Sequence, residues 1–441
     1  MIKYIDTKGL NGRLKIVFLL LCILLTCYSC KDTGIEVIST TQLKVEDVSV
    51  TEVWLRVSMS DGSADIPIKQ NDSLLTTLHS PVDTVLYYAG LLPKHTYTYK
   101  AGKGTTLAVT TMDTTSHNFT WQIDTLGDGM NSSLYDVAII NDTLAYAVGE
   151  IYKKDLTGQM ETSSYGLAKW NGQNWKLEKV RYKAFPTATQ RNPGPLNAIF
   201  AFGPDKIIAT QGSLVMWYDG VSWSEEQFLY DHFTDTSSGG INKFWGISPS
   251  QLWAVGNKGT IFHYNGTSWS KIESGTTLNI QDIWGSYNTK TASYEILAVA
   301  SHSGATYDRK ILQITGTTAS SISDYPIAYP VASVWFVPNR RYYVVGDGIY
   351  EKHTLADSSW KNNPLDFTPY YTTKVYGNAL NDVFFVGSYG DCLHYNGISY
   401  KSYINSGTRL NGVYSAVRTL NNLVIAVGYV DSKACVLMGR R

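Results

Sequence analysis

The chain has 441 residues, which is enough for two or three domains with sizeable cores. Its 37 basic and 37 acidic residues cancel, so no net charge draws it to nucleic acid or to an anionic membrane surface. With 31 tyrosines and 12 tryptophans but only 17% charged residues, the composition favours β-sheet, where aromatic side chains pack well.

The first 29 residues predict an export signal. Lys3, Lys8, Arg13 and Lys15 precede an apolar run, Ile16–Leu25, which is too short to span a membrane. Such a basic stretch before a short apolar segment is typical of a signal peptide that is removed on export.

The end of this signal, Cys27-Tyr28-Ser29-Cys30, resembles a bacterial lipobox. The resemblance implies that Cys30 becomes the lipidated first residue of the mature chain and anchors it to a membrane. Lys31-Asp32 also resembles the charged signal that sends some lipoproteins of Gram-negative bacteria to the cell surface. We therefore expect an exported outer-membrane lipoprotein at the cell surface; the alternative is a plain secretory peptide cleaved nearby. Residues 30–41 then form a tether.

Residues 42–111 predict a separate all-β domain. Six strand-like runs lie in it: Leu43–Val50, Glu52–Met59, Ile66–Lys69, Thr84–Tyr88, Thr96–Ala101 and Thr106–Thr111. The spacing of Leu91, Pro93 and Tyr97, with Trp54 earlier, resembles the fibronectin type III sandwich and its tyrosine corner. The resemblance implies a spacer or a weak adhesion surface rather than a catalytic domain.

Residues 118–441 carry a repeat of three short strands, a turn and a fourth strand, best seen in Ile241–Ile272. The core position of each first strand recurs at intervals from 38 residues (Val375 to Val413) to 62 residues (Val137 to Ile199). The aligned core positions are Val137, Ile199, Phe244, Ile283, Val334, Val375 and Val413. This pattern predicts a seven-bladed β-propeller with four strands in each blade.

The turns and the ends of the repeats complete this prediction. Asn171-Gly172, Asp219-Gly220, Asn265-Gly266 and Asn396-Gly397 predict type I′ hairpins between third and fourth strands. The last repeat lacks a fourth strand, and Trp121–Asp124 matches the missing one, so we expect this N-terminal strand to close the ring. The repeat resembles a propeller repeat of bacterial exported proteins and is distantly similar to the propellers of photosystem assembly factors.

Nearly all long insertions fall between strands two and three or between strand four and the next blade, so one face of the propeller is elaborated. Loops on a rigid scaffold commonly carry function. We expect this face to bind a ligand through aromatic rings and the polar groups between them, an arrangement that suits sugar faces or peptide side chains. The candidate residues are Tyr152, Tyr182, Phe185, Arg191, Tyr230, Asp231, His232, Phe233, Tyr307, Arg309, Tyr370 and Tyr371. The alternative is that these rings pack their own loops.

The sequence predicts a monomeric binding or scaffold protein for a glycan or a protein partner. It predicts no cofactor and no metal site, because none of the usual ligand spacings occurs. One alternative is a glycan-active enzyme on the same face, which requires two carboxylates, for example from Asp231, Asp308 or Asp366, across a pocket. Another is an assembly factor for a membrane complex. Cys392 and Cys435 fall on third strands, and we expect them to be buried free thiols.

Overall fold

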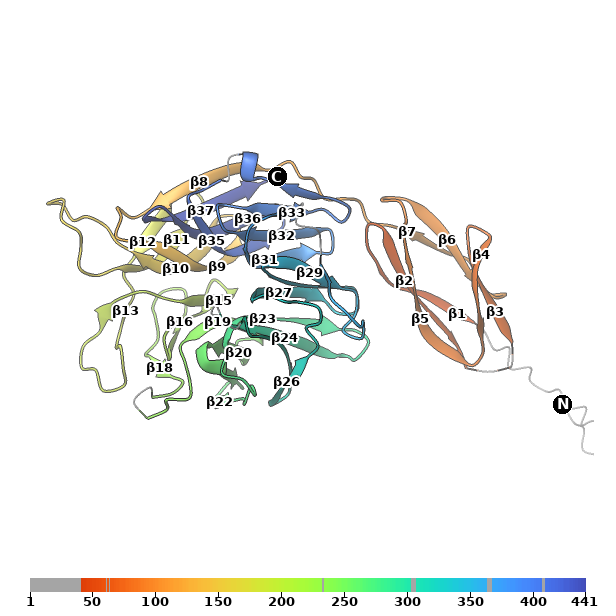
Figure 1. Cartoon of the computed structure of the whole chain (residues 1–441), viewed down its shortest axis with the longest axis horizontal. Coiled ribbons are helices and arrows are strands. Elements are labelled where there is room, and N and C mark those ends of the chain that lie inside the picture. The colour runs from red at the N-terminus through yellow and green to blue at the C-terminus, as the bar shows by residue number, and fades with distance from the viewer. Residues whose placement is uncertain are drawn as a thin grey trace, which may run out of the picture. The chain divides into compact units, whose positions relative to one another are not determined.

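The computed structural model describes residues 41–60, 62, 64–231, 234–302, 307–362, 367–406 and 409–441. The predicted signal peptide, Cys30 and nearly all of the tether lie outside these residues. The chain divides into two units (Figure 1). The first comprises the described residues up to Val48 together with Val53–Tyr88 and Thr96–Thr110, and the second comprises Ser49–Glu52, Ala89–His95 and Thr111–Arg441.

Two antiparallel sheets make up the first unit. Their strand orders are β1-β2-β5 and β4-β3-β6-β7. The strands are β1 (Gln42–Val48), β2 (Glu52–Met59), β3 (Asp65–Gln70), β4 (Ser73–His79), β5 (Val82–Ala89), β6 (Thr96–Ala101) and β7 (Leu107–Thr110). Val57 and Ile68, one from each sheet, are buried in a common core. Strand β4 was not predicted, because it is a mostly exposed edge strand without the apolar alternation of a half-buried one.

Seven four-stranded antiparallel sheets form the second unit. Their first strands are β9 (Ser133–Asn141), β15 (Ala198–Gly203), β19 (Ile241–Ser248), β23 (Asn279–Asn288), β27 (Val331–Val337), β31 (Thr372–Ala379) and β35 (Gly412–Leu420). Each first strand contacts the next, and β35 contacts β9 again, so the seven first strands form a ring.

The other strands follow outward in sequence order. The second strands are β10 (Leu144–Ile151), β16 (Lys206–Gln211), β20 (Gln251–Gly256), β24 (Ser293–Ser301), β28 (Arg341–Gly346), β32 (Asp382–Gly387) and β36 (Leu423–Val430). The third strands are β11 (Tyr165–Trp170), β17 (Leu214–Tyr218), β21 (Ile261–Tyr264), β25 (Arg309–Thr315), β29 (Gly348–Lys352), β33 (Cys392–Tyr395) and β37 (Lys433–Arg440). The fourth strands of the first six sheets are β12 (Trp175–Glu178), β18 (Gln227–Phe228), β22 (Trp269–Lys271), β26 (Thr318–Ile322), β30 (Lys361–Asn362) and β34 (Tyr400–Ser402).

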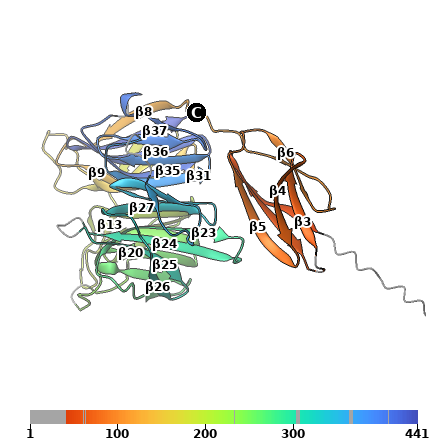
Figure 2. The same cartoon turned by 45° about the vertical axis from the view of Figure 1, so that its right-hand side comes forward.

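The seventh sheet takes its fourth strand from the other end of the unit. Strand β8 (Thr120–Leu126) pairs with β37 over its whole length, and Ile123 lies opposite Leu437. Figure 2 shows the resulting order β8, β37, β36, β35. The start and the end of the chain's second unit are thus hydrogen-bonded in one sheet.

The core of this unit lies between neighbouring sheets. Seven clusters of buried apolar side chains join sheet one to two, two to three and so on around the ring, and the last cluster joins seven to one. In the cluster between sheets two and three, for example, Ile208 packs with Phe244 and Ala254. Both surfaces of every sheet are therefore buried, which explains the nearly continuous apolar runs in the second strands.

Few helical residues occur among those described. A hairpin of β13 (Arg181–Tyr182) and β14 (Asn192–Pro193) and two short 3₁₀ turns, η1 (Asn257–Gly259) and η2 (Ile404–Ser406), complete the elements. Within the described part of the chain, no helix is long and apolar enough to cross a membrane. Cys392 and Cys435 are both buried free thiols.

The predicted type I′ hairpins are wrong in their geometry. The loop between β21 and β22 has four residues, and only Gly266 has a positive φ, of 96°. The side chain of Asn265 instead accepts hydrogen bonds from the backbone N–H groups of Thr267 and Ser268, at 3.0 and 2.9 Å. Asn171, Asp219 and Asn396 make the same two contacts in their own loops. An Asx turn therefore replaces the left-handed conformation expected of the Asn.

The predicted core position of the seventh repeat is also wrong. In β19 a bulge between Ile241 and Lys243 precedes the core residue Phe244, and in β35 the matching bulge lies between Tyr414 and Ala416. The equivalent core residue is therefore Val417, which is fully buried, and not Val413, which is half-buried.

Candidate functional site

The ring has two faces that differ in their connections. Connections between second and third strands and between one sheet and the next lie on one face, here called the loop-rich face, and include 152–164 and 323–330. First–second and third–fourth connections lie on the other, here called the short-turn face. There they span two to four residues, apart from 219–226 and 353–360. The predicted asymmetry of the insertions is present in the structure.

Exposed tyrosines gather on the loop-rich face around sheets four to six. Five of them have between 37% and 67% of their surface exposed: Tyr307, Tyr325, Tyr329, Tyr371 and Tyr389. The rings of Tyr307 and Tyr329 meet edge to face at 5.9 Å. Exposed tyrosines held by their neighbours are a typical feature of protein-binding surfaces, because they give a large contact area at a small cost in side-chain entropy.

A cavity of about 360 Å³ opens inside the ring, at the ends of the first strands that belong to the loop-rich face. Tyr371, Pro330 and Ser301 are among the residues that line it toward the loops, and Asp136, Lys243 and Lys374 line it from the strands. Tyr371 belongs both to this cavity and to the exposed tyrosines. The cavity is called the channel pocket below.

Two buried ion pairs have their lysines in the lining of the channel pocket. Lys243 on the third sheet donates to Asp136 on the first, and Lys374 on the sixth donates to Asp282 on the fourth. All of these side chains are at most 7% exposed. The four residues occupy the position directly before the core residue of their first strands, so the repeat places them on one level of the ring.

The two carboxylates also satisfy backbone groups of the neighbouring first strand. Asp136 accepts from the N–H of Ile199 at 3.1 Å, and Asp282 accepts from the N–H of Val334 at 3.2 Å. The hydroxyl of Ser333 donates to Asp282 at 2.5 Å. A buried carboxylate with several donors is strongly held in its charged form.

The ion pairs shift the acidity of their members. Burial alone would raise the pKa of Asp136, but attraction to Lys243, Arg418 and Lys374 outweighs it and lowers that pKa. Burial, together with repulsion from Arg418 and Lys374, lowers the pKa of Lys243 to about 7. Burial likewise lowers the pKa of Lys374. For both lysines, attraction to the carboxylates therefore does not offset the cost of burial together with repulsion from the other cations.

Arg418 exerts the strongest of these repulsions. It lies two residues beyond Ala416 on β35, and its guanidinium carbon is 4.5 Å from the centre of the Tyr376 ring. Tyr376 in turn meets Trp284 edge to face at 5.2 Å. The electrostatically coupled groups of the channel are thus three cations, Lys243, Lys374 and Arg418, and the two carboxylates described above.

Of the residues predicted from the sequence, only Tyr371 lines the channel pocket. Tyr370 lies beside it, with its ring 5.0 Å from that of Tyr389. Arg309 forms an ion pair with Asp324 at 3.1 Å and lies two residues from Tyr307. These four predicted residues, Tyr307, Arg309, Tyr370 and Tyr371, belong to the same part of the loop-rich face.

The remaining predicted residues lie around sheets one to three. The hydroxyl of Tyr152 donates to Glu150 at 2.5 Å, and this bond with burial raises the pKa of Tyr152 to about 12. Tyr182 is buried in β13 and donates to the carbonyl of Pro195 at 2.7 Å.

Three further predicted residues are held by their own surroundings. Arg191 pairs with Glu226 at 2.9 Å, and the ring of Tyr230 lies parallel to that of Phe262 at 6.3 Å. The carbonyl of Asp231 accepts from the N–H of Asp235 at 2.7 Å. Phe185 is 37% exposed. His232, Phe233 and Asp366 lie outside the described residues.

Sequence reasoning missed the channel charges and three of the tyrosines. Asp136, Lys243, Asp282 and Lys374 each stand directly before an aligned core position, and a charge at that repeated position was a usable signal. Tyr325 and Tyr329 lie in an insertion that was recognised as a loop. Within the described residues no group of three or more His, Cys, Asp or Glu side chains could hold a metal ion.

Comparison with known proteins rests on structure alone. No family model matches the chain, and no curated protein matches it. Solved structures do match. The structure described as YCF48 bound to D1 peptide has a TM-score of 0.53 and 14% identity, and the match covers 74% of this chain and 97% of that one. The WD40 β-propeller domain of Doa1 has a TM-score of 0.50 and 12% identity, with 74% and 98% covered. The fold is a β-propeller. At such low identity the likeness shows the fold and nothing about the ligand.

Proposed function

We propose that this protein is an exported, lipid-anchored scaffold whose propeller binds a segment of a protein partner on its loop-rich face. The observation that carries the proposal is the group of exposed tyrosines on the loop-rich face, one of which, Tyr371, also lines the charged channel pocket. One of the similar propellers is described with a bound D1 peptide, so the fold itself accommodates a ligand of the class proposed.

The tyrosines supply the outer part of the proposed interface. Tyr325 and Tyr389 are 67% and 53% exposed and lie on loops of different sheets, so a bound segment that spans the face can contact both rings. Binding energy in protein interfaces is concentrated in such aromatic residues. Tyr371 continues the aromatic surface into the pocket.

The channel charges give the proposed partner a chemical requirement. Burial, and then repulsion from Arg418 and Lys374, lowers the pKa of Lys243. With three cations to two carboxylates, the group is one negative charge short of balance. An acidic side chain or a terminal carboxylate of the partner, placed in the pocket, supplies that charge. The added negative charge raises the pKa of Lys243, and the protonated lysine in turn attracts the ligand more strongly.

The rest of the chain fits a surface-displayed scaffold. We propose that Cys30 carries the lipid anchor at the outer membrane and that residues 42–111 act as a fibronectin type III-like spacer. In this proposal the propeller has seven blades, β8 completes the last blade and so closes the ring, and the protein is a monomer. Bacterial lipoproteins carry more than one acyl chain, which stable anchoring requires.

The proposal is tested by co-purification of the full chain from membranes of its own cells. We compare the native protein with a Tyr325→Ser/Tyr389→Ser variant and with Tyr287→Ser/Tyr294→Ser, a matched control. Tyr287 and Tyr294 are 49% and 43% exposed but lie by a first–second turn on the short-turn face. We expect one stoichiometric protein partner that is lost only with the first variant. Equal recovery with both variants contradicts the proposal.

A further inference from the structure

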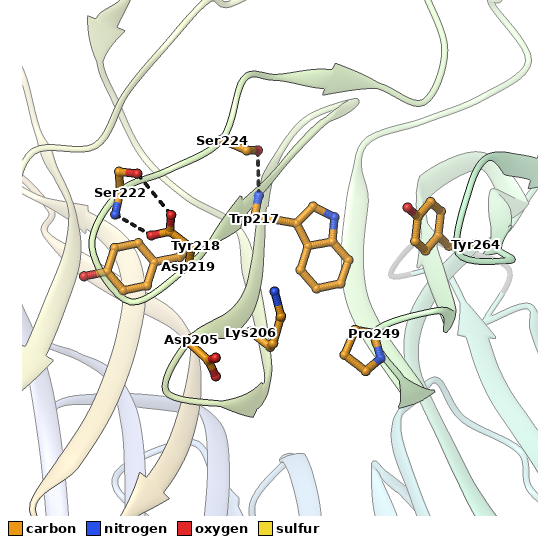
Figure 3. Close-up of a pocket in the computed structure, with 9 residues that line it drawn as sticks. All are labelled: Asp205, Lys206, Trp217, Tyr218, Asp219, Ser222, Ser224, Pro249 and Tyr264. Atoms are coloured by element: carbon orange, nitrogen blue, oxygen red, sulfur yellow. Dashed lines mark hydrogen bonds between the residues drawn. The ribbon is translucent and has the colours of Figure 1, made fainter.

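A second cavity lies on the short-turn face, between the second and third blades, and it plays no part in the proposed function. It has a volume of about 310 Å³ and is lined by Trp217 and Tyr264 from the third strands and by Asp205, Lys206 and Pro249 from the first–second turns. Figure 3 shows the indole of Trp217 and the ring of Tyr264 on neighbouring blades, with Pro249 and Lys206 below them in this view.

Neighbouring aromatic rings and a hydrogen bond hold the rings of Trp217 and Tyr264 in place. The centres of the Trp217 and Tyr264 rings are 6.3 Å apart, and the planes are tilted by 46°. Phe202 stacks on Trp217 at 6.5 Å, and Trp269 lies 5.0 Å from Tyr264. The hydroxyl of Tyr264 donates to the carbonyl of Gly266 at 2.9 Å. A ligand therefore meets two preorganised aromatic faces that lose little entropy on binding.

Two charged side chains in the cavity are available to a ligand. Asp205 and Lys206 are exposed and, among the described residues, neither side chain makes a hydrogen bond or an ion pair. Asp219, by contrast, accepts from the N–H groups of Val221 and Ser222 and holds its own turn. The cavity thus offers a free carboxylate as acceptor and a free ammonium as donor beside the rings.

This combination selects a class of ligand. The two carboxylates, Asp205 and Asp219, outnumber the single ammonium of Lys206, so an anionic ligand is disfavoured, and only one excess negative charge is left to attract a cation. A neutral ring with apolar C–H faces and hydroxyls at its edge stacks on Trp217 and Tyr264 while Asp205 and Lys206 bond its hydroxyls. We infer that this cavity binds a neutral saccharide, independently of the protein partner on the loop-rich face.

The test is direct titration of the purified protein with neutral tetrasaccharides. Cellotetraose, maltotetraose and chitotetraose are the probes, and tetragalacturonate is the anionic comparator. Binding is followed by calorimetry and by quenching of tryptophan fluorescence. We expect at least one neutral probe to bind, Trp217→Ala to weaken it at least tenfold, and Asp205→Asn to weaken it about threefold. Trp217→Phe, which keeps a ring, should retain most of the affinity.

The control is Tyr287→Ala, which removes an exposed ring of the same face outside the cavity and should leave the affinity unchanged. Thermal unfolding of Trp217→Ala checks that the variant is folded, and Asp205→Asn replaces an exposed group and leaves the fold intact. Three results overturn the inference: no neutral probe binds at 10 mM (about the weakest affinity of interest), tetragalacturonate binds more tightly than the neutral probes, or binding survives in Trp217→Ala.

Discussion

The two faces of the propeller are built from the same repeat yet differ in chemistry. On the loop-rich face two ion pairs are buried inside the channel, and exposed tyrosines lie on the loops around sheets four to six. On the short-turn face tight turns dominate, and the free charges Asp205 and Lys206 stand on the surface beside two rings. Because the insertions accumulate on one side, that side can change its partner without altering the blades, while the other side keeps the geometry of the turns.

The largest expected effect comes from breaking a channel ion pair. Lys374→Met leaves Asp282 buried without its cation, and we expect the free energy of unfolding to fall by about 3–5 kcal/mol, as measured by chemical denaturation. Lys206→Met, on the short-turn face, should stay within about 0.5 kcal/mol of the native protein.

The matching rescue is Lys374→Met combined with Asp282→Asn. Asparagine removes the uncompensated charge but keeps an acceptor for Ser333 and the N–H of Val334. We expect at least half of the lost stability to return. A single variant that loses less than about 1 kcal/mol, or a double variant no more stable than the single one, contradicts the view that these charges are structurally coupled.

Ionic strength should separate the two proposed binding sites. Partner binding at the channel mouth rests on net positive charge, so we expect its affinity to fall about tenfold between low and high salt. Saccharide binding rests on stacking and on hydrogen bonds to a neutral ligand, and its affinity should change less than about twofold. Titrations of both ligands across the same salt series measure this difference. Equal salt dependence of the two affinities contradicts the proposed electrostatic difference between the sites.

Acid should weaken the short-turn face at the closure of the ring. There Nδ1 of His117 lies 2.8 Å from Nδ1 of His394. Nε2 of His394 contacts Asp382, and Arg441 pairs with the same carboxylate. Burial, followed by repulsion from His394, Lys401 and Arg441, lowers the pKa of His117 to about 4 from an ordinary 6.5. The unfolded chain therefore takes up a proton below pH 6.5 that the folded one refuses until about pH 4, so stability falls as the pH falls through that window.

Because the His117 ring is only half-buried, solvent screening reduces the effect to about 1 kcal/mol. Thermal unfolding between pH 7.5 and 4.5 measures it. His117→Asn should flatten the decline of the melting temperature with acid. Parallel curves for the variant and the native protein count against this assignment.

The smallest expected effect concerns the turns themselves. Tyr218, Tyr264 and Tyr395 each donate to the carbonyl of the glycine two residues on, at 2.7–2.9 Å. Tyr264→Phe removes one such bond at a partly exposed site and should cost about 1 kcal/mol. Chemical denaturation gives the value, and a variant at least as stable as the native protein contradicts a stabilising role of this bond.

The repeat could be read from the sequence because its signals are local. Alternating apolar residues and the position of Asn265-Gly266 mark the strands and turns of Ile241–Ile272, and β19 to β22 lie there. The turn type was missed because the Asn265 side chain competes for backbone N–H groups, which composition does not reveal. Val413 was chosen over Val417 because both fit an apolar alternation and only the bulge decides between them.

The candidate site was harder because it depends on contacts across the ring. Asp136 and Lys243 are 107 residues apart, and no spacing rule indicates that sheets one and three meet in the channel. Nor does the sequence tell which loop rings turn inward, as Tyr182 does, and which stay exposed, as Tyr325 does. The face could be predicted from the insertions, whereas the pocket required the structure.

The most direct test of the central claim is photo-crosslinking in living cells from both faces. A photoreactive amino acid replaces Tyr371 at the channel pocket in one strain and Tyr287 on the short-turn face in another. The account predicts that position 371 links to one polypeptide, within a few residues of an acidic side chain or a C-terminus, and that position 287 does not. Crosslinking of the same polypeptide from position 287 alone, or none from position 371, contradicts it.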